Sequence, residues 1–146
     1  MSGAANDNLE KVYTLHEAAD AVGFDINAFL SSPTPYTWET LRECSVYVMS
    51  CREFSKIGVA RDTRKRMATL QVANPYELKL VHAEPLRSLT YAGLAERAAH
   101  RVLANRHLRS EWFSVSPELA SKVISVTAGA ARVLASIHDE MNKEAA

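Results

Sequence analysis

The pattern of apolar and polar positions is clearest in the middle of the chain, where it predicts two neighbouring β-strands. β-Branched and aromatic residues cluster at positions 45–50 and again at 56–60, as is typical of strands. The polar segment between the two runs is suited to a turn, so we expect a hairpin. A third strand is expected at residues 77–83, where Leu78 and Leu80 alternate onto one face.

Apolar residues at helical spacing follow the predicted hairpin and the third strand. Asp62 and Thr63 offer an N-cap for a helix that runs through Gln71, with Met67 and Leu70 directed inward. A longer helix follows the third strand, and Thr90 can cap it. Its buried stripe is expected to comprise Leu94, Ala95, Ala98, Val102 and Leu103.

Both ends of the chain are predicted to be helical. Thr14 and Glu17 have capping-box spacing and begin a first helix, which Gly23 ends. A second short helix is expected up to residue 30, and another at residues 37–43. Pro117 begins a last helix that runs into the Ala-rich tail. The predicted division is a helical extension at 1–43, a central domain at 44–115 and a C-terminal helix at 116–146.

The predicted fold class is α/β, of the α+β type, with a small three-stranded mixed sheet flanked by helices and extra helices at both termini. A length of 146 residues suffices for one ordinary domain and is too short for two. Cys44 and Cys51 stand at opposite ends of one predicted strand, which does not suit a disulfide bridge. No leader opens the chain, and no apolar run approaches the roughly 18 residues that span a bilayer. We expect a cytoplasmic protein with no membrane segment.

Charge is distributed unevenly although the formal net charge is zero. Residues 46–113 carry twelve Lys or Arg against six Asp or Glu, a net charge of +6, between flanks of −5 and −1. Most charge runs are solvated helix faces, but a basic centre also suits a nucleic-acid partner. Arg61, Lys65, Arg97 and Arg101 are the candidate nucleic-acid-binding residues, and we expect them to share a face with Arg66.

Four polar side chains in this centre make a minimal set for cutting a phosphodiester with the help of a metal. The reaction needs an activated water, charge relief on the phosphorane and help for the leaving oxygen. Tyr47 could be the general base, but its ordinary pKa of about 10 requires a nearby cation to stabilise the phenolate. Lys56 could supply that charge. Arg66 could donate two parallel hydrogen bonds to the phosphate, which a lysine cannot reproduce.

Glu96 is the candidate metal ligand, for Mg²⁺ or Mn²⁺, with waters and phosphate oxygens completing the shell. His100 lies one helical turn from Glu96 and could orient it or join the activation of water. Each residue also has an ordinary structural explanation: a strand tyrosine with a satisfied hydroxyl, an edge lysine, a solvated arginine, and a carboxylate paired with His100.

The order and spacing of these residues resemble the GIY-YIG nuclease superfamily over residues 44–115, and in particular its small bacterial and phage branch. The matching motifs are Ser45-Val46-Tyr47, Lys56-Ile57-Gly58, Arg66 eight residues after the motif glycine, Glu96, Leu70-Gln71 to Asn74-Pro75, and Glu111-Trp112-Phe113. Three positions depart from the family: the first motif lacks its glycine, Lys56 stands where the second motif has tyrosine, and Leu70 stands where some relatives carry histidine.

The resemblance implies a metal-dependent DNA endonuclease, although the sequence does not distinguish DNA from RNA. Two alternatives remain open because such scaffolds can lose turnover. One is a nucleic-acid-binding module with an inactive site. The other is a protein-interaction domain in which the terminal helices make the contacts.

Overall fold

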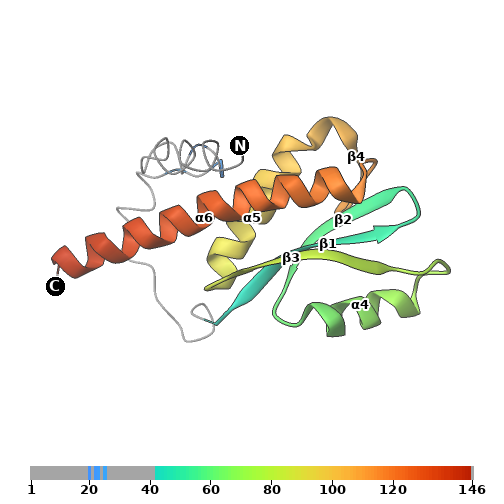
Figure 1. Cartoon of the computed structure of the whole chain (residues 1–146), viewed down its shortest axis with the longest axis horizontal. Coiled ribbons are helices and arrows are strands. Elements are labelled where there is room, and N and C mark those ends of the chain that lie inside the picture. Colours follow the sequence, from blue (N-terminus) through green and yellow to red (C-terminus); the bar gives the residue numbers. More distant parts are fainter. Residues whose placement is uncertain (1–19, 21, 24, 26–41, 146) are drawn as a thin grey trace, which may run out of the picture.

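The computed structural model describes residues 20, 22, 23, 25 and 42–145, and Figure 1 shows their arrangement. The helices predicted at residues 14–30 and 37–43 lie almost entirely outside the described residues. Gly23 is one of the described residues. Its φ is 64°, and its N–H donates to the carbonyl oxygen of Asp20 at 3.0 Å, which is how glycine commonly ends a helix.

The centre of the fold is a five-stranded antiparallel sheet with the order β3-β1-β2-β5-β4. The strands are β1 (Cys44–Cys51), β2 (Phe54–Ala60), β3 (Lys79–Leu86), β4 (His107–Arg109) and β5 (Trp112–Phe113). The mixed α and β class is confirmed, but the expectation of three strands in a mixed sheet is wrong. The two additional strands have three and two residues, too few to show an alternating pattern. After β2 and α4 the chain crosses to the other edge of β1. There β3 pairs with β1 in the antiparallel direction.

The predicted hairpin is confirmed, and its turn contacts the segment before β3. Cys51 pairs with Phe54, so the loop between β1 and β2 has two residues. Arg52 adopts a φ of 56° there, the left-handed conformation that such short turns require. Its guanidinium carbon lies 3.9 Å from the centroid of the Tyr76 ring, and this stacking ties the hairpin tip to the segment before β3.

The register of β1 and β2 sorts their side chains onto two faces. Val46, Val48 and Ile57 face one side and join the main hydrophobic core. Helices α5 (Leu89–Val102) and α6 (Pro117–Ala145) cover this side, whereas α4 (Thr63–Val72) lies on the other side (Figure 1). Tyr47 belongs to the α4 side, which we call the α4 face of the sheet.

Helix α4 begins as predicted. The Asp62 carboxylate accepts a hydrogen bond from the backbone N–H of Lys65 at 3.0 Å, the usual N-cap contact. None of the residues of α4 is fully buried, and Met67 and Leu70 are partly covered. The helix is therefore an outer layer that can present its remaining side chains along the α4 face.

Helix α5 confirms most of the predicted stripe. Its buried residues include Leu94, Ala95 and Ala98, and Leu103 just beyond it is 5% exposed. Val102 was expected to be buried but is 59% exposed, because it is the last residue of the helix and no described residue covers that end. The predicted cap is also corrected: Ser88 is the N-cap, and the helix already includes Thr90.

Helix α6 shares the core with α5 and the sheet, while the predicted boundary between residues 115 and 116 stays a prediction. The Ser116 hydroxyl accepts from the backbone N–H of Leu119 at 3.1 Å and caps the helix before Pro117. Ile124 and Ala128 are fully buried. Alanines dominate this side of the helix, and their small size allows α6 to approach α5 closely.

One segment meets the length and composition of a membrane span, contrary to the expectation from the sequence. It covers 24 residues of α6, from Pro117 to Glu140, with a mean hydropathy of 1.2. Of its most apolar window, 44% is buried inside the fold. The core helix of a soluble protein gives the same pattern, and here the apolar side of α6 packs on α5 and β1.

The packing of α6 predicts a difference between two substitutions on this helix. Ile124→Ala removes a side chain with no exposed surface and should lower the free energy of unfolding by about 2–5 kcal/mol. Val126→Ala, at a position 53% exposed, should change it by less than about 0.5 kcal/mol. Urea denaturation followed by circular dichroism measures both values. Equal effects would mean that α6 is not part of the cooperative core.

Candidate functional site

Gly58 in β2 is the point around which the candidate site is built. It is the register partner of Tyr47 in β1, so both residues belong to the α4 face. A Cβ atom at position 58 would lie 2.6 Å from the hydroxyl oxygen of Tyr47 and 3.2 Å from Oε2 of Glu111. The missing side chain therefore allows a tyrosine hydroxyl and a carboxylate to approach each other over the backbone of β2.

Tyr47 is buried, with 1% of its surface exposed. Burial raises the pKa of its hydroxyl, while a hydrogen bond from the Arg66 side chain acts in the opposite direction. Guanidinium has only donors, so the phenol oxygen accepts this bond and keeps its own proton available for transfer. The carboxylates of Glu111 and Glu96 raise the pKa further, because negative neighbours disfavour a phenolate.

Lys56 in β2 forms an ion pair with Glu111, the residue directly before β5. Its ammonium nitrogen lies 2.6 Å from Oε2 of Glu111, and the residue is 5% exposed. Lys56 is thus held by Glu111, and its expected role in stabilising a phenolate at Tyr47 stays a prediction. The pKa of Tyr47 is raised by burial, and the cation whose hydrogen bond acts in the opposite direction is Arg66.

Helix α5 reaches β2 where its pairing with β5 ends. β5 pairs with Ser55 and Lys56, and the N–H of Ile57 donates to the carbonyl oxygen of Glu111 at 3.1 Å. The carbonyl oxygen of Ile57 instead lies 2.9 Å from Nε2 of His100. Since a carbonyl oxygen has no proton, Nε2 must carry one, and this assignment leaves Nδ1 for another partner. His100 thus anchors α5 to this edge of β2, and its roles in orienting Glu96 or activating water stay predictions.

Glu96 lies one turn before His100 and is half-buried at the same edge. Burial raises the pKa of its carboxyl group, and the charge of Glu111 raises it further. His100, Arg97 and Lys56 act in the opposite direction and do not cancel the increase. Glu96 and Glu111, from distant parts of the chain, therefore act electrostatically on each other and on Tyr47.

This pair of carboxylates fits a hard divalent cation. Mg²⁺ commonly uses one or two carboxylates and completes its shell with waters and substrate phosphate oxygens. Within the described residues, no group of three or more His, Cys, Asp or Glu side chains forms a full metal cage. The chemistry of the donors thus matches a weakly held ion that needs substrate to complete its coordination.

The predicted nucleic-acid-binding cations fall into two sets. Arg61 and Lys65 are exposed beside and on α4, whereas Arg97 and Arg101 are exposed on α5, which packs against the opposite face of the sheet. Arg97 acts electrostatically on Glu96. The guanidinium of Arg101 instead lies close to Gly23. Binding of nucleic acid by these four residues stays a prediction.

Glu111 is the site residue that sequence reasoning did not assign. Glu111-Trp112-Phe113 was only one of the motifs of the resemblance, and its last two residues form β5. The available signal was the alternation of that segment: Phe113 points into the core, so Trp112 must face the other side of the sheet. Nothing in the spacing alone indicated that Glu111 would lie beside Gly58.

Gly58→Ala should disrupt the site more than the fold. The new Cβ would overlap Tyr47, so the ring must move, and we expect a loss of stability of about 1–3 kcal/mol from this overpacking. Gly93→Ala is the matched control, because the nearest atom to a Cβ there is the end of the Arg97 side chain at 3.3 Å. Thermal melts of both variants give the comparison. An unchanged Gly58→Ala protein would show that Tyr47 and Glu111 are not held in this contact.

Glu96→Gln should leave the melting temperature unchanged or raise it by up to about 4 °C near pH 7. A raised pKa in the folded state means that stability is greatest below the ordinary carboxyl pKa, and it is lost as pH rises through the folded value. Glutamine stays neutral at every pH, so the higher melting temperature of Glu96→Gln should disappear below about pH 4, where Glu96 is also neutral. Exposed Glu77 provides the control variant Glu77→Gln. A marked loss of stability at pH 7 would make Glu96 a structural residue.

A comparison with protein families identifies the central part of the chain. Residues 44–128, more than half of the protein, match the T5orf172 domain, a phage-associated domain found in nuclease-like proteins. Comparisons with curated proteins and with solved structures give no match. The matched segment begins at the first residue of β1 and ends within α6, so it contains every residue of the candidate site. The chain belongs to the T5orf172 domain family.

Proposed function

We propose that this protein is a GIY-YIG-type endonuclease that hydrolyses phosphodiester bonds in DNA with Mg²⁺ or Mn²⁺. The observation that carries the proposal is the close approach of Tyr47 and Glu111 over the bare backbone of Gly58, with Arg66 and Glu96 acting on the pKa of Tyr47. A family associated with nuclease-like proteins agrees with a nucleic-acid substrate.

Arg66 would bind the scissile phosphate. It is exposed, and its five N–H donors allow it to keep its bond to Tyr47 while donating two parallel bonds to phosphate oxygens. Lys56 is less suited to this task because it is buried and already paired with Glu111. The phosphate would thereby be held beside the hydroxyl of Tyr47.

Tyr47 would first pass its own proton to a neighbouring carboxylate, and the resulting phenolate would accept a proton from the attacking water. Its raised pKa keeps it neutral in the resting site. Glu96, with Glu111 beside it, would hold the divalent cation, which supplies Lewis-acid stabilisation of the charge that develops on the phosphate. His100 would keep α5, and with it Glu96, at the edge of β2.

The neutral phenol also favours a second candidate function, a nucleic-acid-binding module without turnover. In such a protein the Arg66–Tyr47 contact and the Lys56–Glu111 ion pair would serve mainly to shape a phosphate-binding surface. Cleavage assays separate the two candidates, because both predict binding that weakens with salt and only the nuclease predicts cutting that requires a metal ion.

The decisive experiment incubates the protein with single- and double-stranded DNA in Mg²⁺, Mn²⁺ or chelator. Cutting should require the metal, and Glu96→Gln should abolish it while DNA affinity in chelator changes less than about threefold, because only a metal ligand is removed. Arg66→Lys should reduce the rate by about 10²–10³-fold, since a lysine cannot donate the paired bonds. Arg64→Lys is the control on the same helix and should cut normally.

Two outcomes contradict the nuclease proposal. DNA binding that is retained without cutting in either metal would leave the binding module as the function. Cutting by a folded Glu96→Gln protein at the wild-type rate would show that this carboxylate is not the metal ligand.

A further inference from the structure

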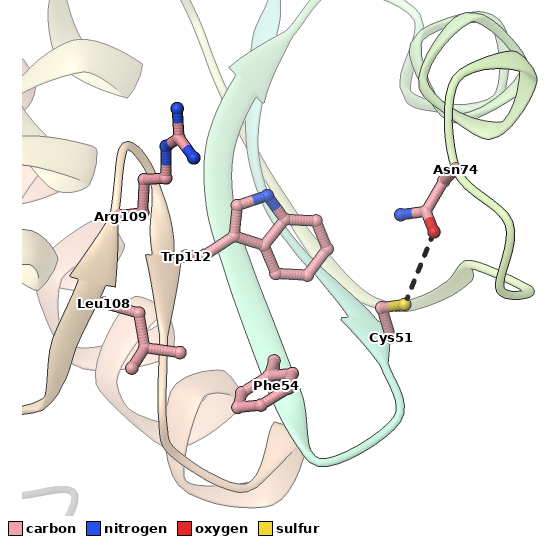
Figure 2. A pocket seen from close by; sticks show the side chains of 6 residues that line it. All are labelled: Cys51, Phe54, Asn74, Leu108, Arg109 and Trp112. Atoms are coloured by element: carbon pink, nitrogen blue, oxygen red, sulfur yellow. Dashed lines mark hydrogen bonds between the residues drawn. The ribbon is translucent and has the colours of Figure 1, made fainter.

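A second hollow opens on the α4 face beside the candidate site. It has a volume of about 260 Å³ and is open to the solvent. Figure 2 shows the six side chains that line it, which come from β1, β2, β4, β5 and the segment after α4. They are Cys51, Phe54, Asn74, Leu108, Arg109 and Trp112.

The hollow continues the site along β2. Gly58, Lys56 and Phe54 alternate onto the same face, and Trp112 is the register partner of Lys56. Two residues of a strand advance about 6.7 Å, so the hollow begins roughly 7 Å from Gly58 and ends about 13 Å from it. Phosphates of one strand in duplex DNA are about 3.4 Å apart along the axis. The hollow is therefore about two to four nucleotides from the scissile phosphate.

The lining combines flat apolar surfaces with positive charge. The Trp112 ring lies across β2 in the middle of the hollow, with Phe54 and Leu108 on one side and the Arg109 guanidinium on the other (Figure 2). The Lys56 ammonium is 5.8 Å from the centroid of the Trp112 ring. Bases stack on aromatic side chains, and cations hold the backbone that carries them.

Asn74 adds a hydrogen-bond donor with a fixed orientation. Its Oδ1 accepts from the backbone N–H of Tyr76 at 3.0 Å and from Sγ of Cys51 at 3.9 Å. These two donors settle which end of the amide is oxygen. The amide nitrogen is then on the Trp112 side (Figure 2), and it makes no hydrogen bond to another described residue. It can donate to an acceptor on the edge of a flat ligand.

We propose that this hollow binds one unpaired nucleobase of the strand that is cut. The inference rests on the proposed action on DNA and adds a base-binding subsite to it. A volume below the roughly 300–1,000 Å³ of drug-sized sites suits a single base and not a base pair. A base whose two faces are covered by neighbours in a duplex cannot lie on the Trp112 ring, so the strand must be unpaired or locally opened.

Photocrosslinking tests the contact directly in the intact protein. Single-stranded oligonucleotides carry one 5-iodouracil at successive positions, and they are bound in chelator so that no cutting occurs. We expect crosslinked peptides that contain Trp112 or Phe54, from a window of no more than about four neighbouring positions. Crosslinks confined to other peptides, with binding retained, would overturn the base-binding subsite and leave the proposed cleavage intact.

Substitutions provide the quantitative test by fluorescence anisotropy in chelator. Trp112→Ala should weaken single-stranded DNA binding by about five- to 150-fold, and Trp112→Phe should restore most of it, because stacking on an aromatic ring contributes that much. Leu108→Gln should also weaken binding, whereas Leu119→Gln on α6 should not. The two leucines are matched, with exposed fractions of 50% and 46%.

The remaining outcomes separate the two proposals. An oligonucleotide with abasic residues at all positions of the crosslinking window should bind the wild-type protein more weakly, by the same factor as the Trp112→Ala substitution weakens binding of the intact strand. If it binds as tightly as the intact strand, the hollow takes something other than a base, such as an apolar side chain of a partner protein. If no nucleic acid binds the wild-type protein at all, the proposed function and the subsite are both wrong.

Discussion

The site depends on the close approach that Gly58 allows. The hydroxyl oxygen of Tyr47 would meet a Cβ at this position at 2.6 Å, and the carboxylate of Glu111 would meet it at 3.2 Å. Any larger residue would push these groups apart, and with them the cations that they hold, Arg66 and Lys56. One position without a side chain thus affects the spacing of two polar pairs, Tyr47 with Arg66 and Lys56 with Glu111, from four separate parts of the chain.

Local sequence patterns were sufficient for the parts of the fold that repeat over several residues. The β1–β2 hairpin and the Asp62 cap follow from alternation and from capping chemistry, and both are confirmed. β4 and β5 are too short for such patterns, so the five-stranded sheet was missed. The exposure of Val102 was missed for a related reason, since periodicity identifies the side of a helix and not where its neighbours end.

Only those residues of the candidate site that belong to motifs with a recognisable spacing could be predicted from the sequence. Arg66 and Glu96, which their spacing singled out, both act on the pKa of Tyr47. The pairing of charges could not be read in the same way, because Glu111 reaches Lys56 only after β5 has paired with β2 across a separation of 55 residues. The position of Glu96 also depends on tertiary structure, since His100, one turn further along α5, contacts the carbonyl oxygen of Ile57 in β2.

The charge balance of the site supports the proposed use of a divalent cation. Lys56 and Arg66 carry two positive charges, and Glu96 and Glu111 carry two negative ones, so the resting site is neutral. The negative charge of Glu96 is still disfavoured, because burial and the charge of Glu111 raise the pKa of its carboxyl group. Burial and the two carboxylates likewise raise the pKa of Tyr47. A bound phosphodiester would add one negative charge, and loss of the phenol proton would add another. One divalent cation restores neutrality, and without it the phenol would resist giving up its proton most strongly when substrate is present.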